Sequence, residues 1–260
     1  MKILTCLREV PGRETRFRIN QLGTWIEDSD ITVEINECDE YALEEALRIK
    51  ETHGGEVTVL SLGTERITKS IRKALAMGAD RAIHIIDSKR RASSPYLIAA
   101  SIAAVISGNE FDLILTGTQS DDMSYAQTGV ILAEMLNLAH ATIVMEIKAD
   151  PQTGNVKALR EMESGRFQWL ELPLPALLAV QAGSSQVRYA SLKGIMQAKK
   201  KKTLKVDIEQ LQIDWDTLPS TELLRLYVPE ASSKAEILEG DPSTVAATLL
   251  ERLIKEAKIL

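Results

Sequence analysis

The stretch that decides the fold is Leu113–Gly129, which reads LILTGTQSDDMSYAQTG. Its opening residues are mostly apolar and predict a buried parallel strand over 112–116. Gly117 and an acidic loop follow, and a helix is predicted to begin near Ala126. A glycine-bearing loop between a strand and a helix favours an anion site, because free backbone N–H groups and the positive end of the helix dipole both face the ligand.

The first turn of this helix is predicted to contain Tyr125, Ala126, Gln127 and Thr128. These residues are candidates for binding a nucleotide phosphate, and the Thr128 hydroxyl adds a donor. An ordinary capped helix gives the same pattern, so the pattern alone leaves both interpretations open. The acidic pair 121–122 suits a ribose, a metal or a solvated loop at the helix entrance.

Strands and helices alternate on the N-terminal side of this stretch. The helix that follows Asn36 has a clear i, i+4, i+7 apolar period, and Glu44, Glu45 and Arg48 are predicted to form its solvated face. This alternation predicts an α/β fold with a parallel sheet flanked by helices on both faces. Strands are predicted at 2–7, 57–62 and 82–86, and helices at 36–50, 67–77 and 95–107.

The pattern changes after residue 140. Three strands and a last apolar run are predicted at 142–148, 156–162, 167–172 and 176–180. Past Lys199 no further parallel-sheet strand is expected. A helix opened by Asp241 carries an apolar stripe, which must be buried against this chain or a partner. We therefore predict a nucleotide-binding α/β domain over 1–198 and an extended C-terminal arm over 199–260.

Composition excludes several classes of function. The 260 residues carry a formal net charge of −6, which argues against a nucleic-acid binder. No apolar run is long enough for a membrane span, and the N-terminus lacks a signal-peptide pattern, so a cytoplasmic protein with reduced cysteines is expected. No metal-ligand cluster, phosphate-binding P-loop or nucleophile motif is present, so neither a bound metal nor a catalytic residue is expected.

Five stretches together resemble one family, the beta subunit of electron transfer flavoprotein, over nearly the whole chain. The most specific is VRYASLKGIMQAK at 187–199, which closely follows a signature of that family. The loop at 117–129 matches the family's G-x-Q…D…T-G pattern. The other three stretches are 3–11, 36–46 and 75–81.

The resemblance implies a heterodimer in which an alpha subunit holds most of a redox-active FAD. It implies for this chain a fold like that of the adenine-nucleotide alpha-hydrolases and one structural AMP. Redox chemistry then resides in the flavin, and the chain is an electron carrier rather than an enzyme. By resemblance, the positions that bind the nucleotide are Cys6, Asn36, Asp39, Leu62, Asp122, Tyr125, Ala126, Gln127 and Thr128.

The resemblance also implies partner surfaces. The loop from Arg188 to Met196 is similar to the segment that recognises a flavin-containing dehydrogenase, with Leu192 as the apolar anchor. Its partner-binding positions are Arg188, Tyr189, Leu192, Ile195 and Met196. The pair Arg160 and Glu161 resembles a contact with the flavin domain of the alpha subunit, where Glu161 would pair with an arginine. The C-terminal helix is expected to dock on the alpha subunit.

Two alternatives stay open. Some relatives bind a second FAD in place of AMP and carry out electron bifurcation with NADH, and Asp39 and Tyr41 near the pocket are not assigned cleanly to either group. The loop with Met123, Ser124 and a bulky Tyr125 resembles more closely the AMP-binding, methylotroph-type members that accept electrons from amine dehydrogenases. The other alternative is a nucleotide-sensing module of the stress-protein type, against which the C-terminal arm and the 188–196 loop both argue.

Overall fold

A nine-stranded sheet is the centre of the computed structural model, which describes every residue except 28–30, 90–91, 109, 184, 216, 220, 222, 230–235, 257, 259 and 260. The strand order is β11-β5-β4-β1-β6-β10-β7-β8-β9. The strands of this sheet are β1 (Lys2–Leu7), β4 (Glu56–Gly63), β5 (Arg81–Ile86), β6 (Leu113–Gly117), β7 (Ala139–Asp150), β8 (Asn155–Met162), β9 (Arg166–Pro173), β10 (Ala176–Val180) and β11 (Thr203–Asp207).

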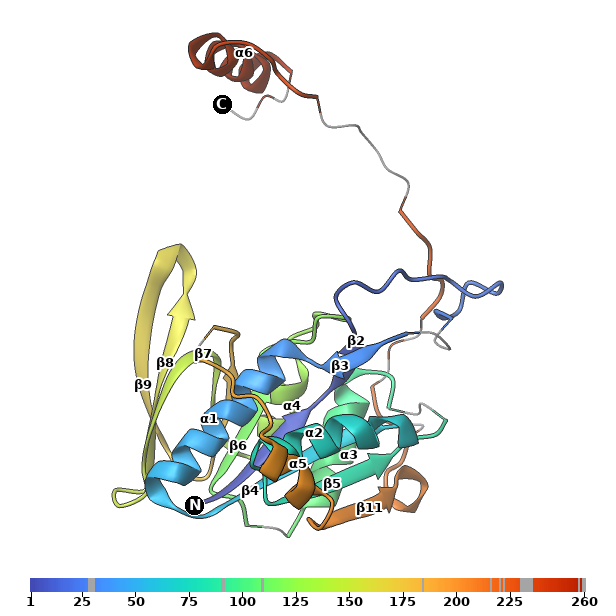
Figure 1. The fold of residues 1–260 in the computed structure, drawn as a ribbon, viewed down its shortest axis with the longest axis vertical. Coiled ribbons are helices and arrows are strands. Elements are labelled where there is room, and N and C mark those ends of the chain that lie inside the picture. The colour runs from blue at the N-terminus through green and yellow to red at the C-terminus, as the bar shows by residue number, and fades with distance from the viewer. Residues whose placement is uncertain are drawn as a thin grey trace. The chain divides into compact units, whose positions relative to one another are not determined.

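Helices connect these strands (Figure 1). They are α1 (Glu37–His53), α2 (Thr68–Met77), α3 (Pro95–Ile106), α4 (Thr128–Met135), α5 (Leu192–Ala198) and α6 (Pro242–Lys255), with short 3-10 turns η1 (Glu65–Ile67), η2 (Glu163–Gly165) and η3 (Ile208–Gln210). Seven strands run parallel, from β11 to β7. A helix lies in each of the connections from β1 to β4, β4 to β5, β5 to β6, β6 to β7 and β10 to β11. The predicted α/β fold with a mostly parallel sheet is confirmed.

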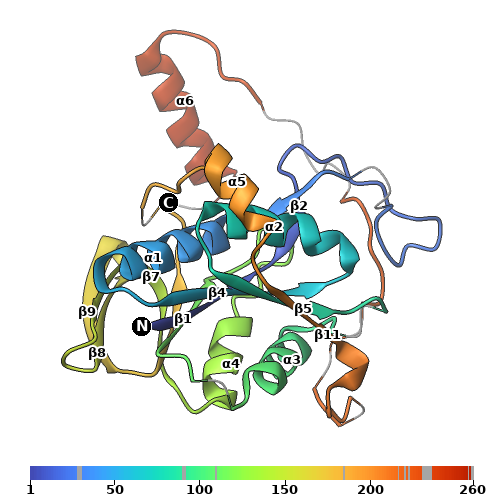
Figure 2. The ribbon, with the colours of Figure 1, turned by 60° about the horizontal axis from the view of Figure 1, so that its bottom comes forward.

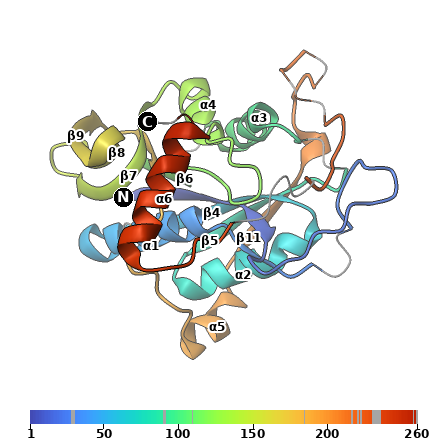
Figure 3. The same ribbon diagram turned by 90° about the horizontal axis from the view of Figure 1, so that it is seen from above.

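Helices cover both faces of the sheet, with α1, α2 and α5 on one face and α3 and α4 on the other (Figures 2 and 3). One core packs α1, α2 and the end of α5 against β1, β4 and β6, with Leu43, Leu75 and Leu113 fully buried. The opposite core packs α3 and α4 against the same strands around Ile102 and Leu132. Aliphatic residues fill both cores, as expected for a chain with only 4% aromatic residues.

The strands predicted after residue 140 are present, and β7, β8 and β9 pair antiparallel. Asp150 Oδ1 accepts from the backbone N–H groups of Gln152 and Thr153, which closes the predicted turn between β7 and β8. A short antiparallel pair of β2 (Glu9–Pro11) and β3 (Val33–Ile35) stands at the end of β1.

Two expectations about the fold were wrong. Strand β11 pairs in parallel with β5, so the sheet takes one more strand after Lys199. Its alternation was hidden because it is an edge strand whose residues are mostly exposed. Glu44 and Glu45 are buried, at 3% and 8% exposure, because the segment that follows β10 covers this face of α1. Only Arg48 of the predicted solvated face is exposed.

The chain divides into two compact units. The first contains the sheet and extends to Leu223, so it includes residues that the sequence analysis assigned to the arm. The second comprises residues 19–26 and 224–260. In it, Asp241 caps α6 by accepting from the N–H groups of Ser243 and Thr244, as predicted, and α6 buries none of its described side chains. None of the described helices has the length and apolar character needed to cross a membrane.

Candidate functional site

The candidate site lies where the order of the parallel strands reverses. From β1 the chain moves outward through α1 to β4 and through α2 to β5, then returns through α3 to β6 on the other side of β1. The connections that leave β1 and β6 therefore diverge at the carboxyl ends of these two strands. In open α/β sheets this switch point forms a crevice that binds ligands.

Asp39, in the first turn of α1, ties the two diverging strand ends together. Its Oδ2 accepts from the Arg8 N–H at 2.7 Å, just past the end of β1. Its Oδ1 accepts from the Gly117 N–H at 2.8 Å, at the end of β6. One carboxylate thus fixes the spacing of the two strand ends, and its charge is held by backbone donors.

Asn36 and Arg8 fix the loop that follows β6. The Asn36 amide donates to the Gln119 carbonyl at 2.8 Å and accepts from the Asp121 N–H at 2.9 Å. Arg8 forms a bidentate pair with Asp122, from Nε at 2.9 Å and from Nη2 at 2.7 Å. The backbone of the 117–122 loop is therefore preorganised by side chains from β1 and α1.

Asp39 and Asn36 are buried, whereas the Arg8–Asp122 pair is partly exposed. The pKa of Asp39 is raised to about 7, because burial disfavours its charged form more than the N–H groups of Arg8 and Gly117 favour it. The pKa of Cys6 on β1 is raised to about 12 by burial and by the nearby Asp39 carboxylate. A thiol of this kind stays protonated and acts as an apolar wall rather than as a nucleophile.

Gly117 allows the close approach that this network needs. A Cβ at Gly117 would overlap Asp39 Oδ1 and lie 2.8 Å from the Cβ of Cys38, so no other residue fits without moving the start of α1. The loop glycine noted in the sequence is thus explained by helix–strand packing.

The start of α4 differs from the prediction. The helix begins at Thr128, so Tyr125, Ala126 and Gln127 precede it rather than form its first turn. Ala126 and Ser124 both have a φ of 53°, in the left-handed region, which bends the loop before the helix starts. Among the described residues no side chain caps α4, so its first N–H groups remain open to a ligand.

A cavity of about 300 Å³ lies beside this helix start. Its lining residues are Thr118, Gln119, Ala126, Val130, Thr142, Ile143 and Gln181, from the loop, α4, β7 and the end of β10. Ile143 has a φ of 55°, which is strained for a β-branched residue, and lies where the pairing of β7 with β10 shifts register. Strain of this kind concentrates at functional sites, and here it shapes the wall of the cavity.

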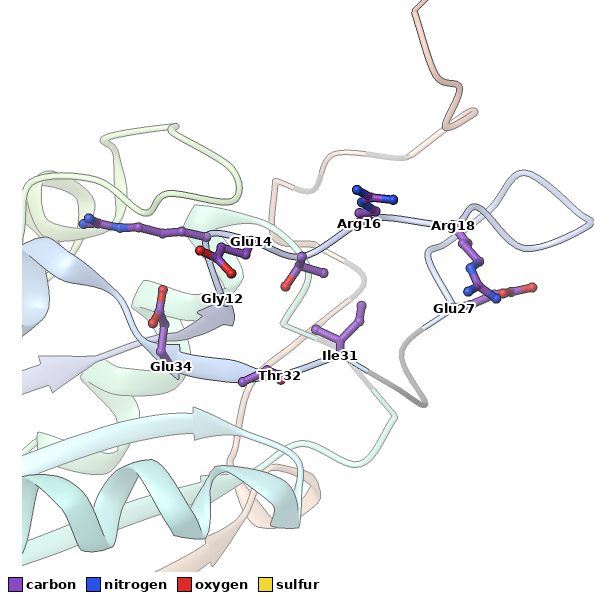
Figure 4. A pocket seen from close by; sticks show the side chains of 10 residues that line it. Gly12, Glu14, Arg16, Arg18, Glu27, Ile31, Thr32 and Glu34 are labelled. Carbon is purple, nitrogen blue, oxygen red and sulfur yellow. The ribbon is translucent and has the colours of Figure 1, made fainter.

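A larger cavity of about 560 Å³ lies along the loop between β2 and β3 (Figure 4). Its lining residues are Gly12, Arg13, Glu14, Thr15, Arg16, Arg18, Glu27, Ile31, Thr32 and Glu34. Figure 4 shows the side chains of Arg18 and Glu27 next to one another, on segments joined by a backbone hydrogen bond of 2.8 Å. Charges of both signs line this cavity, and none of the predicted nucleotide-binding residues belongs to it.

The predicted recognition segment presents an apolar face. Tyr189 is 97% exposed, Leu192 84% and Met196 72%, and Ile195 is also exposed. Leu192 is the first residue of α5 rather than a loop residue, because Ser191 caps the helix by accepting from the Gly194 N–H at 3.0 Å. We name the exposed side chains of Leu192, Ile195 and Met196, with Tyr189, the docking face.

Arg188 differs from the other predicted partner-binding residues. Its guanidinium and its backbone N–H are hydrogen-bonded to Glu44, and the guanidinium also pairs with Glu51. The two carboxylates raise the pKa of Arg188 above its ordinary value. Arg188 therefore faces α1 and is not presented with the docking face.

Arg160 and Glu161 lie near the end of β8, where Arg160 pairs with Gln168 and Glu161 with Phe167 across the ladder. Both side chains are half-buried, and within the described residues Arg160 Nε has no hydrogen-bond partner. A buried donor without a partner is costly, so this edge of the hairpin suits a further partner.

Comparison with known proteins assigns the family. Residues 24–211 match the model of the electron transfer flavoprotein domain. The chain is 34% identical to the electron transfer flavoprotein subunit beta of Methylophilus methylotrophus, over 99% of each chain, and 34% identical to that of Bacillus subtilis (strain 168), over 90% of this chain and 91% of the relative. The chain belongs to the electron transfer flavoprotein beta-subunit family. The protein FixA of Sinorhizobium fredii is 33% identical, over 79% of this chain and 73% of the relative. The predicted family is confirmed, and with it a role in electron transfer.

The structure of the chain brings only part of the predicted site together. Hydrogen bonds join Asn36 and Asp39 to the 117–122 loop and join Asp122 of the loop to Arg8, and Cys6 lies beside Asp39. Leu62 lies near the end of β4 and packs into the core beside α3. The sequence reasoning missed Arg8, although its place after the first strand at the switch point was a usable signal. It also missed Gln181 and Ile143. These residues line the cavity because of the register between β7 and β10, and the sequence does not reveal that register.

Proposed function

We propose that the chain binds AMP at the switch point and forms, with an alpha subunit that holds most of an FAD, a heterodimeric electron carrier. The nucleotide would be enclosed by Cys6, by Leu62 and by the 117–122 loop. Asn36, Asp39 and Arg8 hold this loop in place. The observation that carries the proposal is the start of α4, where no described side chain caps the helix, next to the preorganised 117–122 loop and a cavity lined by both polar and apolar side chains. A phosphate there would accept from the free N–H groups of the first helical turn and from the Thr128 hydroxyl.

The nucleotide has a structural role in this proposal. A ligand that binds only the folded state stabilises it by mass action, and AMP would fill the crevice between the two diverging strand connections. When FAD is bound to the heterodimer it supplies the redox chemistry, and the residues of this chain bind and orient.

The proposal is tested by the nucleotides that the heterodimer carries. The chain is co-expressed with an alpha subunit, the purified complex is denatured, and the released nucleotides are separated by chromatography. We expect equal amounts of FAD and AMP. Release of FAD in twofold amount without AMP would replace the AMP assignment by a second flavin. Absence of any adenine nucleotide beyond the alpha-subunit FAD would reject the site at α4.

The second-flavin alternative stays open because some members of the resembling family bind a second FAD, and because the chain is also 33% identical to a relative with another name, the protein FixA. Reduction of the complex by NADH would support it. Family membership favours electron transfer over the nucleotide-sensing, stress-protein interpretation.

The docking face is the proposed contact with the electron-donating, flavin-containing dehydrogenase. Large apolar side chains exposed at helical spacing on α5 can enter a pocket on a partner, and the side chain of Leu192 is the most exposed of those on the helix.

A second apolar surface lies on α6, where Leu249, Leu250 and Ile254 form an exposed stripe. This stripe is proposed to dock on the alpha subunit.

Glu161 is proposed to pair with an arginine of the alpha subunit near its flavin. Replacing Glu161 with alanine in the heterodimer is expected to slow electron transfer about fivefold, as expected for the loss of about 1 kcal/mol of charge pairing. Stopped-flow reduction of an acceptor measures this rate. Glu171→Ala, which removes an exposed carboxylate from the neighbouring strand, is the matched control. Equal rates in the Glu161 variant and the wild type would count against the pairing.

A further inference from the structure

Glu44 is a buried carboxylate in the middle of α1, at 3% exposure. It accepts from Arg188 Nε at 2.8 Å, from Arg188 Nη2 at 3.0 Å and from the Arg188 N–H at 3.1 Å. It also accepts from Arg48 Nε at 2.9 Å. A buried charge of this kind is retained in a fold only when its hydrogen bonds are satisfied, and here Arg188 supplies most of them.

The guanidinium of Arg188 also pairs with a second carboxylate of α1. Its Nη1 pairs with Glu51, seven residues beyond Glu44, and its Nη2 also donates to Glu51 at 3.0 Å. Every nitrogen of the guanidinium therefore has a carboxylate partner on α1. A partner protein that drew this cation away from α1 would break a charge-matched, partly buried network.

The segment that begins at Arg188 carries the docking face. Ser191 caps α5 three residues later, and the backbone at Gly194 packs so closely on α2 that a Cβ there would overlap the carbonyl oxygen of Ala76. After α5, Lys201 donates to the Leu75 carbonyl at 2.9 Å, at the end of α2. The helix is thus fixed on α2 from Gly194 onward, and Arg188 fixes the strand-like segment that leads into it.

We propose that Arg188 is a positioning residue that holds the docking face in place through Glu44 and Glu51, and that it does not contact the dehydrogenase. The proposal rests on the proposed function of the docking face. An anchor such as Leu192 binds more tightly when its segment is already ordered, because less conformational entropy is lost on association. The pairing of Arg188 with the two carboxylates of α1 supplies that order before the partner arrives.

The first test measures order in the segment without any dehydrogenase. Hydrogen exchange of the backbone amides of 189–198 is followed in the heterodimer for Arg188→Met, Arg188→Lys and Glu51→Gln. We expect exchange to rise about tenfold in Arg188→Met and by a smaller factor in Glu51→Gln, with partial recovery in Arg188→Lys, which keeps the charge but not the bidentate geometry. Glu51 is exposed, so its variant tests the proposal even where Arg188→Met fails to fold.

Glu40→Gln is the matched control for exchange. Glu40 lies on the same helix and pairs with Lys73 of α2, away from the segment. Its variant is expected to leave exchange of 189–198 unchanged. Wild-type exchange in both the Arg188→Met and the Glu51→Gln protein would overturn the proposal.

The second test separates positioning from direct contact. Reduction of the heterodimer is measured with a flavin-containing amine dehydrogenase as the donor. Glu44 is buried and cannot touch the donor, so Glu44→Gln and Arg188→Met are both expected to raise KM for the heterodimer about tenfold with little change in kcat, and the double variant is expected to be no worse than Arg188→Met alone. An increase in KM for Arg188→Met with none for Glu44→Gln would mean direct contact and would overturn the proposal.

Leu192→Ala distinguishes failure of this inference from failure of the docking face. A raised KM in Leu192→Ala, with wild-type KM and exchange in the Arg188 variants, would keep the docking face and reject the positioning role. Wild-type KM in Leu192→Ala would reject the docking face, and with it the functional part of this inference, whatever the exchange data show.

Discussion

Replacing Gly117 with alanine is expected to lower the free energy of unfolding by about 3 kcal/mol, the upper range for overpacking a close contact. The new Cβ would overlap Asp39 Oδ1 and lie 2.8 Å from the Cβ of Cys38 and 3.0 Å from the Asp39 nitrogen. The carboxylate cannot move aside, because its two oxygens already accept from Gly117 and Arg8. The start of α1 would have to retreat from β6, and the clamp on both strand ends would be lost.

Urea denaturation of the purified chain measures this effect, and nucleotide content of the heterodimer measures its consequence for the site. Gly12→Ala is the matched control, because the nearest atom to its Cβ, the Thr32 carbonyl oxygen, is 3.4 Å away. A Gly117→Ala protein within about 0.5 kcal/mol of the wild type would show that α1 can shift at little cost.

The parallel core of the fold could be predicted from the sequence because its strands are short apolar runs separated by helices of clear period. The run at 176–180 coincides with β10, and 82–86 lies within β5. Strand β11 was missed because this short, exposed edge strand alternates polar and apolar residues, a pattern that also suits a loop. The burial of Glu44 was missed because only tertiary contact with the 188 segment shows that a charged position on α1 is covered.

The candidate site was predicted by location more than by geometry. The Leu113–Gly129 stretch does place a strand, a loop and a helix start at the switch point, and Asn36, Asp39 and Asp122 do meet there. The helix began later than predicted, because left-handed backbone at Ser124 and Ala126 cannot be inferred from residues that rarely adopt it. The resemblance indicated which positions lie in the partner-binding segment, but not what each side chain contacts. Arg188 was assigned to the partner, whereas its side chain pairs with Glu44 and Glu51 of α1.

Replacing Asp39 with asparagine is expected to remove a pH dependence of stability between about pH 4 and pH 7. Burial raises the pKa of Asp39 from 3.8 to about 7 in the folded state. In this range the folded protein therefore holds a proton that the unfolded chain has lost, so the free energy of unfolding falls as the pH rises. A raised pKa of this size corresponds to about 4 kcal/mol, lost between these two pH values and absent in the variant.

The difference in unfolding free energy between the wild type and Asp39→Asn is expected to change with pH in one direction. Near pH 4 both carry a neutral group, but the amide leaves the N–H of either Arg8 or Gly117 without an acceptor, so the variant is expected to be the less stable there by about 1 to 3 kcal/mol. Between pH 4 and pH 8 the wild type loses about 4 kcal/mol that the variant keeps, so the Asp39→Asn protein is expected to overtake the wild type in this range. Urea denaturation of both chains at several pH values measures the difference. Asn36→Ala removes a hydrogen bond that lowers the pKa of Asp39, so this variant should keep the pH dependence that Asp39→Asn abolishes.

The opposite trend, a wild type that gains stability over the variant as the pH rises, would mean that the N–H groups of Arg8 and Gly117 outweigh burial. The expected result has a consequence for the site. A carboxylate that costs stability at neutral pH is kept for what it positions, and Asp39 positions the two strand ends that frame the nucleotide crevice. The Asp39→Asn heterodimer should therefore be stable but carry less AMP, because an amide cannot accept from both backbone N–H groups at once.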